Sequence, residues 1–72
     1  YIFAQGNTSP YQVYVGEILG AESLSIEGCL ESYTDVSYQS VYPCTAPIAR
    51  PFPLSVTYTF PDGSQVTRSI TY

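Results

Sequence analysis

The feature that most constrains the fold is the strict two-residue alternation of residues 53–72. Apolar and hydroxyl-bearing side chains alternate on both sides of a Pro61-Asp62-Gly63 turn, which is the pattern of two antiparallel strands with one buried face. The apolar rows comprise Leu54, Val56, Tyr58 and Phe60 before the turn, and Val66, Arg68, Ile70 and Tyr72 after it. This stretch is therefore predicted to form a β-hairpin.

The length of the loop decides the register of this hairpin. A two-residue loop of Asp62 and Gly63 would place Phe60 opposite Gln65, which mixes the apolar row of one strand with the polar row of the other. In a three-residue loop, Pro61 presets φ at the first turn position and Gly63 accepts the left-handed conformation of the last. The three-residue loop aligns the two apolar rows, with the pairs Tyr58–Val66, Val56–Arg68 and Leu54–Ile70. We therefore predict the three-residue loop.

The scarcity of basic residues excludes several classes of function. The 72 residues contain no lysine or histidine, only Arg50 and Arg68 are basic, and the net charge is −4. Nucleic acids and anionic membranes attract basic patches, so we expect neither as a partner, and the apolar runs are too short for membrane insertion. Histidine is the commonest general base and lysine the Schiff-base residue, so we expect no enzyme and no cofactor. Three carboxylates, Glu27, Glu31 and Asp35, lack the compact spacing of a calcium site.

Cys29 and Cys44 are the only cysteines in the chain. Without histidine or a third thiol they are unsuited to a zinc site, and their spacing is not that of a CxxC redox motif. We expect them to form one structural disulfide. A structural disulfide indicates an oxidising compartment, and so a secreted or cell-surface location.

The first ten residues are predicted to be an arm and linker ahead of a single β domain at 11–72. The arm is a short, apolar segment with β propensity, consisting of Tyr1, Ile2, Phe3 and Ala4. The linker that follows is polar and rich in turn residues. Within it, Asn7 begins an Asn-Thr-Ser pattern and is a candidate for N-glycosylation.

Alternation elsewhere predicts about five strands and no helix. The expected strands are 11–19, 23–30, 36–42, 54–60 and 65–72, with a proline-rich crossing over 43–53, because proline cannot donate within a sheet. A hairpin turning near 32–35 would bring the two cysteines together. The predicted fold is all-β: a small antiparallel sandwich or open barrel, immunoglobulin-like in style but incomplete, because a complete domain of that kind uses about seven strands.

An incomplete sheet leaves exposed edges, and edges without lysine invite pairing with another chain. We therefore expect a secreted structural subunit of an extracellular filament or surface assembly, with copies of itself as partners. Polymerisation would proceed by strand pairing or by donation of the arm. The candidate interface residues are Tyr58, Arg68 and Tyr72.

The alternative function is that of a monomeric secreted binding protein, such as an inhibitor, toxin or effector. The eight tyrosines suit half-buried strands and contact surfaces equally. Arg68, in the apolar row, either extends its stem from the sheet edge or forms an ion pair across a subunit contact.

Overall fold

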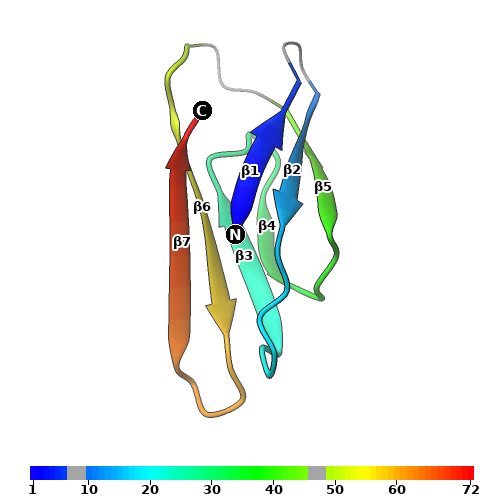
Figure 1. The fold of residues 1–72 in the computed structure, drawn as a ribbon, viewed down its shortest axis with the longest axis vertical. Helices are drawn as coiled ribbons and strands as arrows, with labels where there is room; N and C mark the ends of the chain where they lie inside the picture. The colour runs from blue at the N-terminus through cyan, green and yellow to red at the C-terminus, as the bar shows by residue number, and fades with distance from the viewer. Residues whose placement is uncertain (7–9, 46–48) are drawn as a thin grey trace.

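The computed structural model of the chain describes residues 1–6, 10–45 and 49–72 (Figure 1). Seven strands lie in this part of the chain, and none of its segments is a helix long and apolar enough to cross a membrane. The strands are β1 (Ile2–Gln5), β2 (Tyr11–Val15), β3 (Ser23–Glu27), β4 (Tyr33–Val36), β5 (Val41–Cys44), β6 (Pro53–Thr59) and β7 (Gln65–Thr71). They form two antiparallel sheets, one in the order β1-β2-β5 and the other in the order β4-β3-β6-β7.

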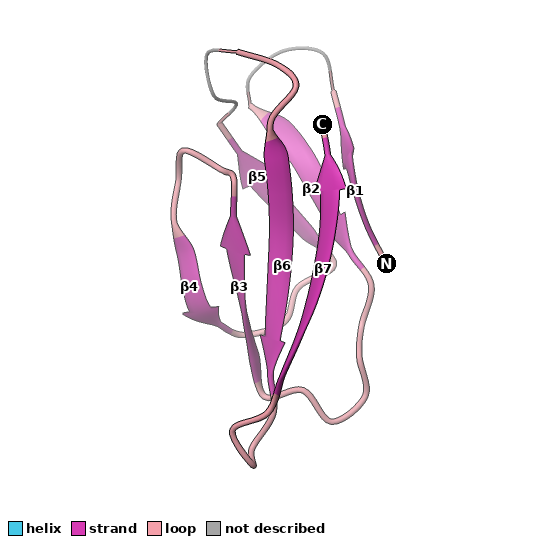
Figure 2. Ribbon diagram, turned by 90° about the vertical axis from the view of Figure 1, so that its left-hand side faces the viewer, coloured by secondary structure: helices cyan, strands magenta, loops and turns pink. Residues whose placement is uncertain are grey.

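The two sheets pack face to face around one hydrophobic core, which confirms the prediction of a small antiparallel sandwich (Figure 2). Each inner strand contributes every second residue, as the alternation of the sequence requires. The fully buried side chains include Tyr11, Val13, Val15, Leu24, Tyr42, Leu54, Val56 and Tyr58. Burying an aliphatic side chain of this size contributes about 1.5–3 kcal/mol, so this core is the main source of stability.

The C-terminal hairpin has the predicted register. Its pairs are Leu54–Ile70, Val56–Arg68 and Tyr58–Val66. The N–H of Phe60 donates to the carbonyl oxygen of Ser64 (2.9 Å), and the N–H of Gly63 donates to the carbonyl oxygen of Phe60 (2.9 Å). These bonds close the three-residue loop, with Gly63 at φ 89°.

Residues 33–44 differ from the prediction, which treated 36–42 as one strand that follows a turn near 32–35. The segment instead contains β4 in one sheet and β5 in the other, with a crossover between them. The hydroxyl of Tyr42 holds the crossover, because it accepts from the N–H of Gln39 (2.8 Å) and donates to the carbonyl oxygen of Ser37 (3.0 Å). Alternation continues through the segment in the sequence, so it carries no sign that the chain changes sheets.

The predicted disulfide between Cys29 and Cys44 is present. Cys29 follows β3 and Cys44 ends β5, so the bond joins the two sheets. Beside it, the N–H of Leu30 donates to the carbonyl oxygen of Thr45 (3.0 Å).

The proline-rich crossing begins later than predicted, because Pro43 lies within the edge strand β5. Proline is accepted there because its nitrogen faces away from the neighbouring strand.

The arm predicted at residues 1–4 is seated within its own chain. It forms most of β1, which pairs with β2 so that Ile2 lies opposite Val15 and Phe3 opposite Tyr14. Ile2 is buried in the core, and the N–H of Gly16 donates to the carbonyl oxygen of Tyr1 (2.7 Å).

With β1 and the split of β4 from β5, the fold has seven described strands in place of about five. In the constant-type immunoglobulin order the fourth strand belongs to the other sheet, whereas here β4 pairs with β3.

Candidate functional site

Strand β7 lies at an edge of the four-stranded sheet (Figures 1 and 2). Phe52 and Tyr72 exchange backbone hydrogen bonds of 2.9 Å just beyond the strand ends. Antiparallel bonds occur at every second pair, so the even-numbered residues of β7 bond to β6. The outward backbone groups belong to Gln65, Thr67, Ser69 and Thr71, and no backbone hydrogen bond within the described residues reaches them. We call this row the β7 edge.

The β7 edge differs from the other sheet edges in length and regularity. β1, β4 and β5 are four residues long, whereas β7 has seven. β5 contains Pro43, and β4 pairs irregularly with β3 and includes Asp35 at φ 52°. β7 contains no proline, glycine or lysine. Short strands, proline, bulges and lysine protect edges from pairing, and β7 has none of these; the one charged residue of the strand is Arg68.

The side chains of β7 are divided between its two faces. Val66, Ile70 and Tyr72 are half-buried on the inner side, and Arg68 in the same row is exposed. The Nη1 atom of Arg68 donates to the carbonyl oxygen of Thr67 (3.3 Å). The guanidinium group therefore lies at the edge of the sheet. This is the position expected if the aliphatic stem of Arg68 extends along the sheet and carries the charge to solvent.

The three candidate interface residues lie in different environments. Tyr58 is in the core, where its hydroxyl donates to the carbonyl oxygen of Gly16. Burial raises the pKa of this phenol above its ordinary value. Tyr72 is half-buried, and the guanidinium carbon (Cζ) of Arg50 lies 4.4 Å from the centroid of its ring. Arg68 is therefore the exposed member of the three.

A row of stacked aromatic rings crosses the outer face of the three-stranded sheet. The ring centroids of Tyr1 and Phe3 are 6.1 Å apart, those of Phe3 and Tyr14 are 4.7 Å apart, and both pairs are nearly parallel. Tyr1 is 74% exposed and Phe3 is 44% exposed. Gly16 makes room for Tyr1, because an added Cβ would lie 2.7 Å from its ring. The sequence pattern identified the tyrosines but not this row, because the row requires the β1–β2 pairing.

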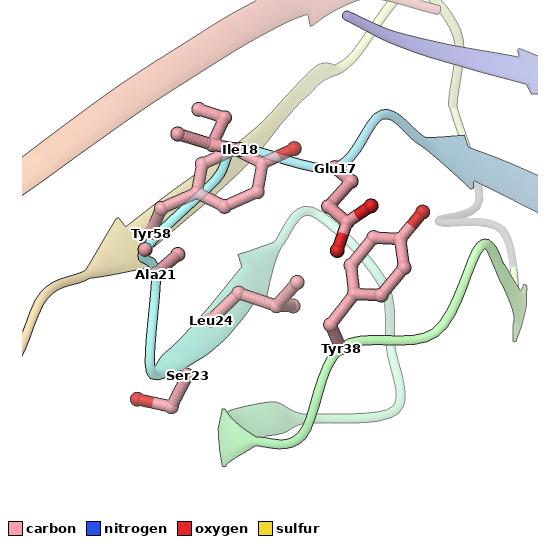
Figure 3. A pocket seen from close by; sticks show the side chains of 8 residues that line it. Glu17, Ile18, Ala21, Ser23, Leu24, Tyr38 and Tyr58 are labelled. Atoms are coloured by element: carbon pink, nitrogen blue, oxygen red, sulfur yellow. The ribbon is translucent and has the colours of Figure 1, made fainter.

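The cavity shown in Figure 3 lies between the β2–β3 connection and the four-stranded sheet. Its walls include Glu17, Leu24, Tyr38 and Tyr58. The volume is about 50 Å³, room for a water molecule or two, whereas small-molecule sites usually have about 300–1,000 Å³. The hydroxyl of Tyr38 donates to the carbonyl oxygen of Val15 (3.2 Å), so this side chain ties the β4–β5 crossover to β2.

The acidic residues of the described chain form no cluster that could hold a metal ion. Within residues 1–6, 10–45 and 49–72, no three metal-ligating side chains gather at one point. Asp62 caps the hairpin loop, because its Oδ1 accepts from the N–H (2.9 Å) and the hydroxyl (2.7 Å) of Ser64. Both bonds favour the carboxylate and lower the pKa of Asp62. Asn7, the glycosylation candidate, lies outside the described residues.

Comparison of the chain with protein-family models, curated proteins and solved structures found no match.

Proposed function

We propose that this chain is a structural subunit of an extracellular assembly and associates with copies of itself by pairing of sheet edges. The observation that carries the proposal is the β7 edge, a regular strand of seven residues whose outer backbone groups form no backbone hydrogen bond among the described residues. Backbone N–H and C=O groups are obligatory hydrogen-bonding groups, and a second strand satisfies them in register. An edge of this kind is a template for another strand.

The extracellular setting is supported by the disulfide. Cys29 and Cys44 are joined, and structural disulfides persist mainly in oxidising compartments. The bond joins two sheets of a chain of only 72 residues. Chains of this size bury a smaller fraction of their surface than larger domains do, and they often depend on such covalent links.

Donation of the arm is the less direct route to assembly. β1 is hydrogen-bonded to β2 and buries Ile2, so donation would require it to leave its own sheet. The exchange would expose the edge of β2 until a neighbour replaced the strand. Pairing at the β7 edge requires no such opening, so it is the favoured contact.

The test is Ser69→Pro, compared with wild type and with Ser69→Ala in sedimentation velocity experiments over a wide range of concentrations. The N–H of Ser69 points out of the sheet, so proline removes an edge donor and leaves the bonds to β6 intact. Wild type and Ser69→Ala are expected to associate, and Ser69→Pro is expected to remain monomeric with an unchanged circular dichroism spectrum. Wild type that is monomeric throughout, or folded Ser69→Pro that associates like wild type, would contradict the proposal.

A second candidate function, binding of a different molecule by a monomer, is favoured by the aromatic row. Exposed aromatic side chains are enriched at binding hot spots, and Tyr1 and Phe3 are both exposed. If the chain is monomeric, Phe3→Ser should weaken capture of its ligand. The matched control is Thr71→Ser, an exposed position on the other sheet.

A further inference from the structure

We infer that the assembly is built on a two-fold dimer, in which β7 pairs antiparallel with β7 of a second copy and the pairing is centred on Ser69. This inference rests on the proposed function. It adds the partner strand, the symmetry and the register of the contact.

The choice of partner strand follows from the lengths of the available edges. β1, β4 and β5 each offer four residues, and the outward side of β5 lacks the donor of Pro43. Within the described residues, only another β7 offers a regular edge of seven residues. A strand pairs antiparallel with its own copy when a two-fold axis passes through the contact, and each outward N–H then meets an outward C=O.

Three registers keep the outward residues opposite one another over most of the strand, and they are centred on Thr67, Arg68 or Ser69. Centring on Arg68 gives the longest overlap but places two guanidinium groups directly opposite each other, which is destabilising. Centring on Thr67 places the half-buried Ile70 opposite Ser64 of the polar loop. Neither register suits the inner face of the strand.

The register centred on Ser69 satisfies both requirements. It places Ile70 opposite the aliphatic stem of Arg68 and Val66 opposite Tyr72, so apolar surface meets apolar surface. The guanidinium group of Arg68 lies diagonal to the Tyr72 ring of the second copy, where a cation–π contact can form. Three outward residues of each strand, Thr67, Ser69 and Thr71, then supply about six intermolecular backbone hydrogen bonds.

Such a dimer joins the two four-stranded sheets into one continuous sheet. A two-fold contact closes on itself, so growth into a filament requires a second contact elsewhere on the molecule. The outer face of the three-stranded sheet, with Tyr1 and Phe3 exposed, belongs to the other layer and is the apolar surface available for that contact.

The test is cysteine cross-linking of the full chain under mild oxidation, read on non-reducing gels. In the proposed dimer the two Ser69 Cα atoms are about 5.5 Å apart, which is within disulfide range. The two Thr67 residues are four positions out of register, so their Cα atoms are about 14 Å apart. Ser69→Cys should therefore form a covalent dimer, and Thr67→Cys and Gln12→Cys, at positions that are also exposed, should not. Peptide mapping should show the Cys29–Cys44 bond intact in each variant.

Each other outcome overturns the inference in a distinguishable way. Cross-linking through Thr67→Cys in place of Ser69→Cys would retain the β7 contact but refute the register. Concentration-dependent association without cross-linking at either position would refute the pairing of β7 with β7, and the Ser69→Pro comparison would then decide whether the proposed function stands. A chain that stays monomeric with its native circular dichroism spectrum would refute both.

Discussion

Replacing both cysteines, as Cys29→Ala with Cys44→Ala, is expected to remove a large part of the stability of this domain. The disulfide closes a loop with a sequence separation of 15, and this loop contains β4, the crossover and β5. The chain-entropy model assigns about 3 kcal/mol to a closed loop of this length. Cys44 is also fully buried, so loss of its sulfur adds a packing cost on the order of 1 kcal/mol.

The two contributions can be separated by urea unfolding of three samples followed by circular dichroism. Oxidised against reduced wild type isolates the cross-link, and reduced wild type against the double alanine variant isolates the packing of the two side chains. For a domain of this size, 3 kcal/mol corresponds to a fall in melting temperature of roughly 10–25 °C. A loss below about 1 kcal/mol on reduction, with a native spectrum retained, would refute the reasoning from loop closure.

Two further predictions test the packing of the fold. Gly28→Ala should cost about 3 kcal/mol or more, because the residue has φ 108° and a methyl group would overlap the Pro53 carbonyl oxygen and lie 3.0 Å from the Leu54 Cα. Gly63→Ala, at φ 89° with open space around it, should cost only about 1–2 kcal/mol; equal losses in chemical denaturation would contradict this. Burial raises the pKa of Tyr11, Tyr42 and Tyr58 above 10.0, so their contribution to stability is complete below pH 10 and is lost as the pH rises through the folded values. Tyrosinate absorbance should show these phenols ionising together with unfolding, and ionisation of all eight near pH 10 in a folded chain would refute the expectation.

Among the candidate site residues, the sequence placed the disulfide and the hairpin loop correctly and left the surfaces undecided. Arg68 was assigned to the apolar row opposite Val56, and it lies there with its charged end exposed. Tyr58 belongs to the apolar row of β6 and is buried in the core, because the β2–β3 connection covers the sheet at Tyr58. Alternation identifies a face, whereas the depth of burial depends on which distant segment covers that face.

The sequence alone determined the local structure of the C-terminal hairpin. In the hairpin at 53–72, the two-residue period and the Pro61-Asp62-Gly63 turn act over a few neighbouring residues, and one register satisfies both. The tertiary structure decided how the strands are distributed between sheets. β1 pairs with its own β2, and residues 33–44 divide between the two layers, because strand pairing and inter-sheet packing join residues far apart in the chain. The same distant contacts leave β7 at an edge, so the surface on which the proposed assembly rests is visible only in the folded molecule.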